Sequence, residues 1–184
     1  MSTYELLLLL HIVAVIVWLG AALALTLLIL RAELARDNAA KAEINAGSEW
    51  LAVRVFIPAS LSTLIFGVLA MVEGPWGLDQ LWVAVGLAGW AVSFLTGILY
   101  FKPETERVEA LVSEQGAESP EVQRRLDQME LIGRIELTVL FVVVGDMVIK
   151  PTGDDTGILI AGAALLAGVA AVLVSIARSR PAAA

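Results

Sequence analysis

The chain has 184 residues, of which 59% are hydrophobic and 17% charged, and its mean hydropathy is +0.84. Soluble domains contain roughly 45 to 50% apolar residues, so we expect lipid rather than water around most of this chain. A formal net charge of -7 disfavours nucleic acid as a partner, because phosphate binding requires a basic surface. The absence of cysteine excludes disulfides and thiolate metal sites, and the single histidine excludes bis-histidine haem ligation within one chain.

Long apolar stretches predict membrane-spanning helices at about 4–30, 50–72, 81–101, 131–149 and 156–177. Each stretch approaches the roughly 20 residues that a helix needs to cross a bilayer. The first stretch is expected to stay in the mature protein, because the amino terminus lacks the basic region of a cleaved signal peptide. The fourth contains Arg134, Glu136 and Asp146, which are costly to place in lipid. The predicted fold class is therefore all-α, a polytopic transmembrane helix bundle that forms a single membrane domain over 1–184.

Two polar segments, 31–49 and 102–130, predict helical hairpin extensions on the cytoplasmic side. Both are rich in residues that favour helices. The first is expected to end at Gly47, with Ser48 placed to cap the next helix. The second is expected to turn at Gly116 before a new helix begins.

The distribution of basic residues predicts the orientation. If the five spans alternate, 11 of the 12 lysines and arginines fall on one side and Lys150 alone falls on the other. Cytoplasmic loops carry the excess of basic residues. We therefore expect the amino terminus outside and the carboxyl terminus in the cytoplasm.

Ligating or ionisable side chains at membrane depth are candidates for function, because their burial in lipid is costly. His11 is the first candidate, as a ligand of a haem iron or a copper ion with Met147 or Met71 opposite it. Histidine with methionine is a recognised axial pair, and a thioether suits Cu(I). Asp146 would orient the imidazole, and Trp18, two turns from His11 on the same face, would wall the pocket. In the alternative interpretation all five residues are structural, making helix contacts or reaching water.

A second group of ionisable residues lies near the other membrane boundary. Arg54, Arg134 and Glu136 predict a charge pair or network there. Such a network is either structural or part of a proton path.

The first span resembles known families. Its sequence LHIVAVIVWLGAAL is similar to the opening helix of the copper-resistance-D type of bacterial membrane protein and of the HemJ-type protoporphyrinogen oxidase, where leucine-histidine is followed by tryptophan and glycine. The chain most resembles an uncharacterised bacterial integral-membrane family of the same group, which ends its fourth span in a valine-rich stretch and lysine-proline, as DMVIKP does here. The resemblance implies four core spans, to which the fifth is an addition, and a haem or metal ligand at His11.

The leading hypothesis is a bacterial inner-membrane protein that binds a b-type haem or a metal ion near the outer face through His11. One alternative is a non-catalytic accessory or scaffold subunit whose hairpins and small-residue faces dock a membrane-complex partner or a second copy. Another is a small transporter that uses Glu136, Arg54 and Asp146 along a pathway. Catalysis has little support, because the sequence shows no nucleophile-base pair, phosphate loop or metal-ligand cluster.

Overall fold

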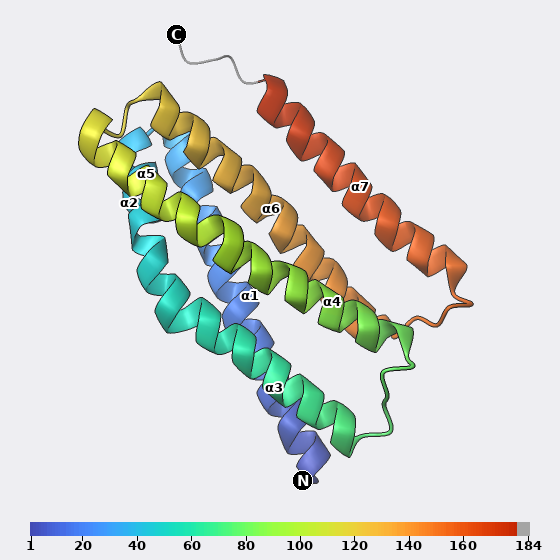
Figure 1. Cartoon of the computed structure of the whole chain (residues 1–184). Coiled ribbons are helices and arrows are strands. Elements are labelled where there is room, and N and C mark those ends of the chain that lie inside the picture. The colour runs from blue at the N-terminus through green and yellow to red at the C-terminus, as the bar shows by residue number, and fades with distance from the viewer. Residues whose placement is uncertain (180–184) are drawn as a thin grey trace.

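A computed structural model describes residues 1–179, and every regular element in them is a helix (Figure 1). The prediction of an all-α fold is thus confirmed. The elements form five continuous rods. In chain order these are α1 (Thr3–Ala35), then α2 (Asn38–Leu51) joined to α3 (Ile57–Glu73) through the π-helical segment η1 (Ala52–Phe56), then α4 (Leu81–Thr96) joined to α5 (Lys102–Gln115) through the π-helical segment η2 (Gly97–Phe101), then α6 (Pro120–Ile149) and α7 (Thr156–Ser179).

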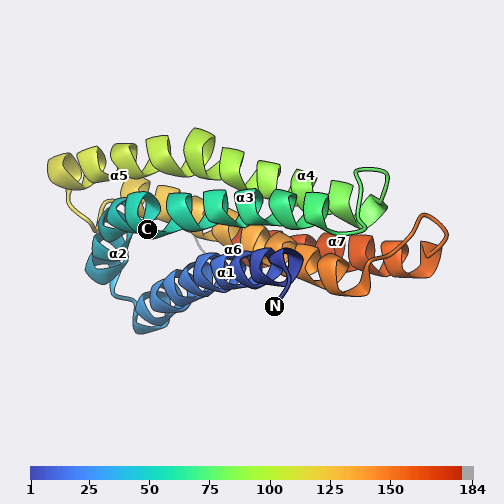
Figure 2. The same ribbon diagram turned by 90° about the horizontal axis from the view of Figure 1, so that it is seen from below.

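Helices α1, α3, α4 and α6 lie side by side as a bundle, and α7 lies outside it (Figures 1 and 2). α1 packs against α3 and α6, α4 packs against α6, and α7 packs against α6. Helices α2 and α5 and the first turns of α6 gather at the end of the bundle opposite the amino terminus. The polar segments of the sequence are therefore helices that pack on one another at this end.

Four rods are long and apolar enough to cross a membrane, within the part of the chain that the structure describes. They are Thr3–Ala35, Asn38–Glu73, Leu81–Gln115 and Thr156–Ser175. α6 is not among them, because its stretch 131–149 contains three ionisable side chains. The apolar surface is extensive: Ile16 on α1, for example, is 64% exposed. The last residues of the chain, including Arg180, one of the basic residues that predict the orientation, lie outside the described range.

The first polar segment turns earlier than predicted. Gly47 and Ser48 lie within α2, so the predicted helix end there is wrong. The helix continues through Gly47 because α2 packs against its neighbours there. The Ser48 hydroxyl donates a hydrogen bond to the Asn45 carbonyl oxygen (2.6 Å) and does not cap a helix. The chain turns at Arg36, which adopts a left-handed conformation (φ 55°), and Asp37 then caps α2. The predicted turn at Gly116, between α5 and α6, is confirmed.

Each π-helical segment ends two residues before a proline. Pro58 follows η1 and Pro103 follows η2 in the same register. A proline has no N–H and its ring crowds the carbonyl one turn earlier. A wider turn relieves this crowding, which explains why each rod continues through its proline instead of breaking. Both wide turns lie where an apolar helix meets a polar one.

Two buried clusters hold the bundle together. The first, at the end formed by α2, α5 and α6, consists of Ala42, Val108, Val122, Leu126 and Met129. The second joins α1, α3 and α6 through Trp18, Ala59 and Leu140, with Trp90 of α4 packed against it. The indole N–H of Trp90 also donates to the carbonyl of Ser60 (2.9 Å), which ties α4 to α3.

Candidate functional site

A cavity of about 320 Å³ lies inside the bundle, and members of both buried clusters line it. Helices α1 to α6 and both π-helical segments contribute to its wall. The wall is mainly apolar, with side chains that include Trp18, Leu25, Phe56, Phe94 and Leu140. The wide turns η1 and η2 face it through Val53 and Phe56, and through Gly97, Ile98 and Phe101.

One pole of the cavity is polar and buried. Lys41, Asn45, Thr105 and Glu130 line this pole, and each is at most 8% exposed. The amide nitrogen of Asn45 is buried and makes no hydrogen bond to any residue that the structure describes. An unpartnered buried donor costs about 1–3 kcal/mol. This nitrogen is covered by protein atoms, so it adds a polar group to the wall without being exposed in the cavity.

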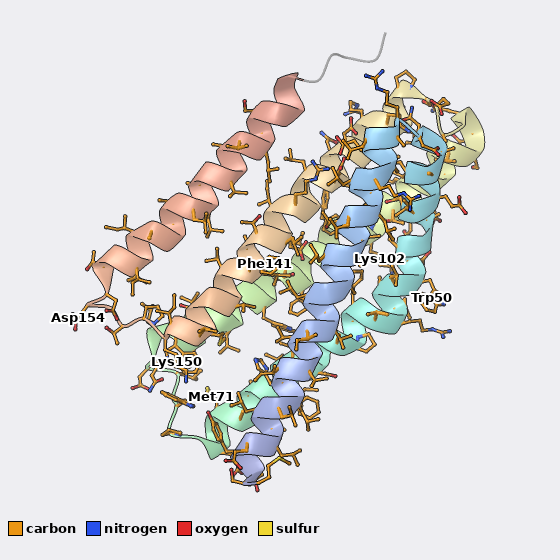
Figure 3. The ribbon with its side chains drawn as sticks, turned by 180° about the vertical axis from the view of Figure 1, so that it is seen from behind. Trp50, Met71, Lys102, Phe141, Lys150 and Asp154 are labelled. Atoms are coloured by element: carbon orange, nitrogen blue, oxygen red, sulfur yellow. The ribbon has the colours of Figure 1, made fainter. Side chains whose placement is uncertain are left out.

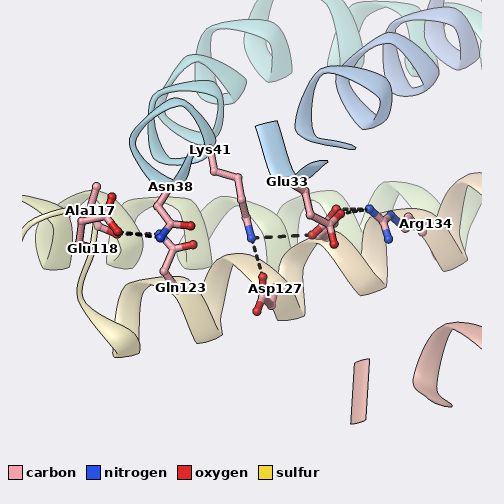
Figure 4. Close-up of polar contacts among 9 residues, drawn as sticks. Glu33, Asn38, Lys41, Ala117, Glu118, Gln123, Asp127 and Arg134 are labelled. Carbon is pink, nitrogen blue, oxygen red and sulfur yellow. Dashed lines mark hydrogen bonds and ion pairs between the residues drawn. The ribbon is translucent and has the colours of Figure 1, made fainter. Parts of the chain in front are cut away.

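A carboxylate network lies next to this pole, and Figure 4 shows its contacts. We use this name for Glu33 of α1, Lys41 of α2, and Asp127, Glu130 and Arg134 of α6. The Lys41 ammonium lies 2.5 Å from the Asp127 carboxylate and 3.9 Å from that of Glu130. The Arg134 guanidinium lies 2.6 Å from the Glu33 carboxylate and also pairs with Glu130. Three helices are joined by these contacts.

Burial controls the protonation of the network. Burial, and after it the neighbouring Glu33 carboxylate, raises the pKa of Glu130 to about 7, although Arg134 and Lys41 act in the opposite direction. Glu130 therefore exchanges a proton near neutral pH, beside the polar pole of the cavity.

Arg134 pairs with Glu33 and Glu130, whereas the sequence predicts Arg54 and Glu136 as its partners. Glu136 lies further along α6, where it accepts a hydrogen bond from the Ser93 hydroxyl. Both side chains line the cavity. Arg54 lies over the Trp50 ring at 5.9 Å. Among the contacts of the described residues, none joins Arg54, Arg134 and Glu136 to one another.

His11 packs against α3. Its Nδ1 lies 2.8 Å from the carbonyl oxygen of Thr63, so this nitrogen is the donor and Nε2 is left as an acceptor. The ring rests on Gly67, where an added Cβ would come within 2.8 Å of Nδ1. Trp18, predicted on the same face of α1, lies in the second buried cluster and lines the cavity, whereas His11 is not part of that lining.

The other predicted ligands lie on other helices. Met147 of α6 faces α4 and packs so closely on Gly86 that an added Cβ would collide with its methyl group. Met71 of α3 lies at the same end of the bundle as Lys150 (Figure 3). Asp146 has one buried carboxylate oxygen without a hydrogen-bond partner. Within residues 1–179, no three histidine, aspartate or glutamate side chains are grouped as metal ligands.

The end of the bundle at the amino terminus is held by aromatic rings. We call Tyr4, Trp76, Trp82 and Lys150 the aromatic end. The Trp76 indole N–H donates to the Tyr4 hydroxyl (3.2 Å), and the Trp76 and Trp82 rings meet edge to face at 5.2 Å. The Lys150 ammonium lies 3.9 Å from the Trp76 ring centre and 5.2 Å from that of Trp82.

Comparison with protein families agrees with a multi-helix membrane architecture. The model of a family described as predicted integral membrane protein (DUF2269) matches residues 5–151. The chain belongs to this family. It is accordingly an integral, multi-pass membrane protein in contact with the lipid bilayer. The DUF2269 match includes every residue that lines the cavity, and α7 lies beyond it. No curated protein and no solved structure matches the chain.

Proposed function

We propose that this protein binds a small lipid-soluble molecule in the cavity enclosed by α1 to α6. The observation that supports this is the combination of a mainly apolar wall with a few buried polar side chains, among them Lys41, Thr105 and Glu130. Ligand pockets commonly enclose roughly 300–1,000 Å³ and combine apolar walls with a few placed polar groups. The cavity of about 320 Å³ has both properties.

The rim of the cavity supports entry from the bilayer. Val53, Ile57 and Ile98 line the cavity, and each is between 38% and 57% exposed. Exposed apolar side chains of a membrane protein face lipid, so a ligand dissolved in the bilayer reaches the cavity between η1 and η2. Glu49 and Lys102, which are also exposed, mark the polar side of the rim.

Ligand content tests this proposal. Gly97 lines the cavity, and a Cβ there would meet no other atom within 4 Å, so the side chain of Gly97→Leu starts in open space and takes up cavity volume. Gly168 on α7 is equally open but exposed away from the cavity, which makes Gly168→Leu a matched control. Mass spectrometry of organic extracts from protein purified in mild detergent should find a molecule bound to wild type and G168L and absent from G97L. Equal ligand content in all three would exclude the cavity as the site.

For the topology, we propose that α6 is a fifth span and that α2 and α5 extend into the cytoplasm of a bacterium, with the amino terminus outside the inner membrane. Support comes from the basic-residue asymmetry and from the packing of α6 against α1, α4 and α7, which shields its ionisable side chains from lipid.

The absence of cysteine makes a direct test of topology simple. Single variants Thr3→Cys and Ser113→Cys place a thiol at exposed sites on opposite ends of the bundle. An impermeant maleimide applied to intact cells should label T3C, and should label S113C only after the membrane is opened. The reverse pattern would invert the proposed orientation.

Haem or metal binding through His11 is a second candidate, and one observation favours it. The contact of Nδ1 with the Thr63 carbonyl leaves Nε2 available, and ligating histidines are commonly oriented by such a bond. The resemblance of the first helix to the copper-resistance-D and HemJ types supports the same residue. Met147 faces α4 and His11 faces α3, so the candidate rests on His11 alone, without Met147 as a second ligand.

An absorption spectrum and metal analysis of the purified protein test this second candidate. Haem or stoichiometric metal should be present in wild type and lost in His11→Ala, while Thr63→Val, which keeps the backbone carbonyl, should retain it. Colourless, metal-free wild type with a normal melting profile would refute metal binding at His11 and leave the cavity proposal untouched.

A further inference from the structure

We propose that the molecule bound in the cavity is a lipophilic cation, an ammonium group on an apolar body, whose charge pairs with the Glu136 carboxylate. This inference rests on the proposed function and specifies the charge of its ligand. Three features of the cavity support it: the carboxylate faces the cavity, no basic side chain of the described residues pairs with it, and aromatic rings line the same wall.

Glu136 lies in the middle of the face that α6 turns toward the cavity. The lining residues of this helix follow one another at intervals of three and four, as Gly133, Glu136 and Leu140 do, which is the spacing of a single helix face. Ser93 of α4, also in the lining, donates a hydrogen bond to one oxygen of the Glu136 carboxylate, Oε1. The carboxylate therefore lies where α4 and α6 border the cavity.

The second oxygen of this carboxylate, Oε2, is accessible. No described residue donates a hydrogen bond to it. Within residues 1–179, fully covered side-chain polar atoms without a hydrogen-bond partner occur on Asn45, Arg125, Glu130 and Asp146, and not on Glu136. Oε2 therefore keeps accessible surface. Gly97, one turn beyond Ser93 on the same rod, leaves space for a ligand nearby, because a Cβ there would meet no atom of a neighbouring helix within 4 Å.

The buried lysine of the lining does not neutralise Glu136. In the part of the chain that the structure describes, no lysine, arginine or histidine forms an ion pair with this carboxylate. Lys41 pairs instead with Asp127 and Glu130. Glu130 precedes Glu136 by six residues, which corresponds to about 9 Å along α6. Lys41 is thus paired at a different level of the cavity.

The other lysine of the lining, Lys102, lies at the rim. It follows Ser93 by nine residues on the same rod, which corresponds to about 13 Å, and it is exposed. Glu49, also exposed, gives the rim a charge of opposite sign. An ionised carboxylate in an apolar wall is costly unless a cation accompanies it, and a cationic ligand at Glu136 removes that cost.

Aromatic rings give the cation a second kind of partner. Trp18 of α1, Phe56 of η1 and Phe94 of α4 line the cavity. The Phe94 ring is stacked on Trp90, with ring centres 5.0 Å apart, so its orientation is supported from outside the lining. The face of an aromatic ring attracts an ammonium group, most strongly where water is excluded. A neutral molecule gains nothing comparable from these rings and the carboxylate, and an anion would be repelled by the carboxylate.

Two probes of equal shape test the charge of the ligand. Benzyltrimethylammonium and neopentylbenzene differ only in the atom that bears the three methyl groups, so the first is a cation and the second is neutral. Equilibrium dialysis measures the affinity of each probe for the full chain in phosphatidylglycerol nanodiscs, after correction for binding to empty nanodiscs.

Variants of the lining separate the carboxylate from the rest of the cavity. Glu136→Gln keeps an acceptor for the Ser93 hydroxyl and removes the charge, so it should weaken the cation about 10- to 100-fold and leave the neutral probe unchanged. Glu49→Gln, the same change at the exposed rim, should bind both probes like wild type. Phe94→Leu removes a ring but no charge and should weaken the cation about fivefold, which tests the inference independently if E136Q does not fold.

The inference and the proposed function fail on different results. A cation that binds E136Q as tightly as wild type, a neutral probe that loses as much affinity as the cation, or a cation that does not bind wild type would overturn the charge assignment. The ligand content of G97L would still decide the proposed function. Where the cation binds, its displacement by added phosphatidylethanolamine identifies a lipid headgroup as the source of the ammonium, and no displacement identifies a free amine.

Discussion

The carboxylate network and the aromatic end each hold a lysine, and they hold it by different means. Lys41 has a side chain that is 6% exposed and is paired with the carboxylates of Asp127 and Glu130. Lys150 lies over the rings of Trp76 and Trp82. The first lysine is a buried charge that needs charged partners, whereas the second is a partly exposed charge near the end of a helix.

This difference indicates at which end of the bundle the side-chain contacts contribute most to stability. A buried charge that loses its partner costs several kcal/mol, whereas a cation over an aromatic ring contributes less when water is near. The carboxylate network also joins α1, α2 and α6, and it borders the cavity. Four experiments, taken from the largest expected effect to the smallest, test this contrast between the two ends.

Loss of the buried ammonium should have the largest effect. Lys41→Met removes the cation beside Glu130, which keeps Arg134, and beside Asp127, whose side chain is 40% exposed, and it should lower the free energy of unfolding by about 2–3 kcal/mol. Thermal denaturation in detergent measures the change. Arg107→Met, which removes a side chain that is 65% exposed and paired with Glu104, should cost only about 0–1 kcal/mol. Equal losses in the two variants would contradict the distinction.

The network should also make stability depend on pH. The pKa of Glu130 is about 7 in the folded chain and 4.5 as its ordinary value. Between these values the unfolded chain loses this proton and the folded chain keeps it, so stability should fall as the pH rises from about 4.5 to about 7 and stay level above. Glu130→Gln should flatten this part of the profile of melting temperature against pH. Glu106→Gln, an exposed change on α5, should leave the wild-type slope, and an E130Q slope as steep as that of wild type would refute the assignment.

Disturbing the contact between His11 and α3 should have the next largest effect on stability. Gly67→Ala places a Cβ within 2.8 Å of the His11 Nδ1 and displaces the ring from the Thr63 carbonyl. The cost of such overpacking is about 1–3 kcal/mol. Gly20→Ala on α1 meets no neighbouring side chain within 4 Å and should be neutral or slightly stabilising, since alanine favours helix. Melting temperatures that do not separate the two variants would show that His11 is not held against α3.

The aromatic end should respond least. Lys150→Met keeps the aliphatic stem over the indoles and removes the charge, so the loss should be about 0.5–1 kcal/mol. Tryptophan fluorescence during unfolding reports this change directly, because both rings contact the lysine. A loss as large as that of Lys41→Met would mean that Lys150 is held as tightly as the buried lysine.

Much of the architecture could be predicted because it depends on local properties. Apolar length and composition identify the rods, and the left-handed Gly116 (φ 82°) marks the turn between α5 and α6. The predicted helix end at Gly47 was wrong, because packing of α2 against its neighbours outweighs the low helix propensity of glycine. One ion pair of Arg134 could be predicted from the sequence, since Glu130 precedes it by four residues on the same helix face.

The candidate site was hidden for a different reason. Asn45 and Lys41 belong to a segment whose composition is that of an ordinary exposed helix. Nothing local indicates that Lys41 meets Asp127, 86 residues further along the chain. The prolines that follow Phe56 and Phe101 were visible, but that their wide turns face one cavity was not.

Sequence alone determined that this protein is embedded in lipid, because long apolar stretches favour transfer from water into the bilayer. It also determined that the protein is built of helices, because a helix satisfies its backbone hydrogen bonds between neighbours along the chain. Tertiary structure alone decided which polar groups are buried together and which donors, among the described residues, lack a hydrogen-bond partner. That outcome depends on how the rods rotate and pack, and a helix face in the sequence does not specify the face that meets it.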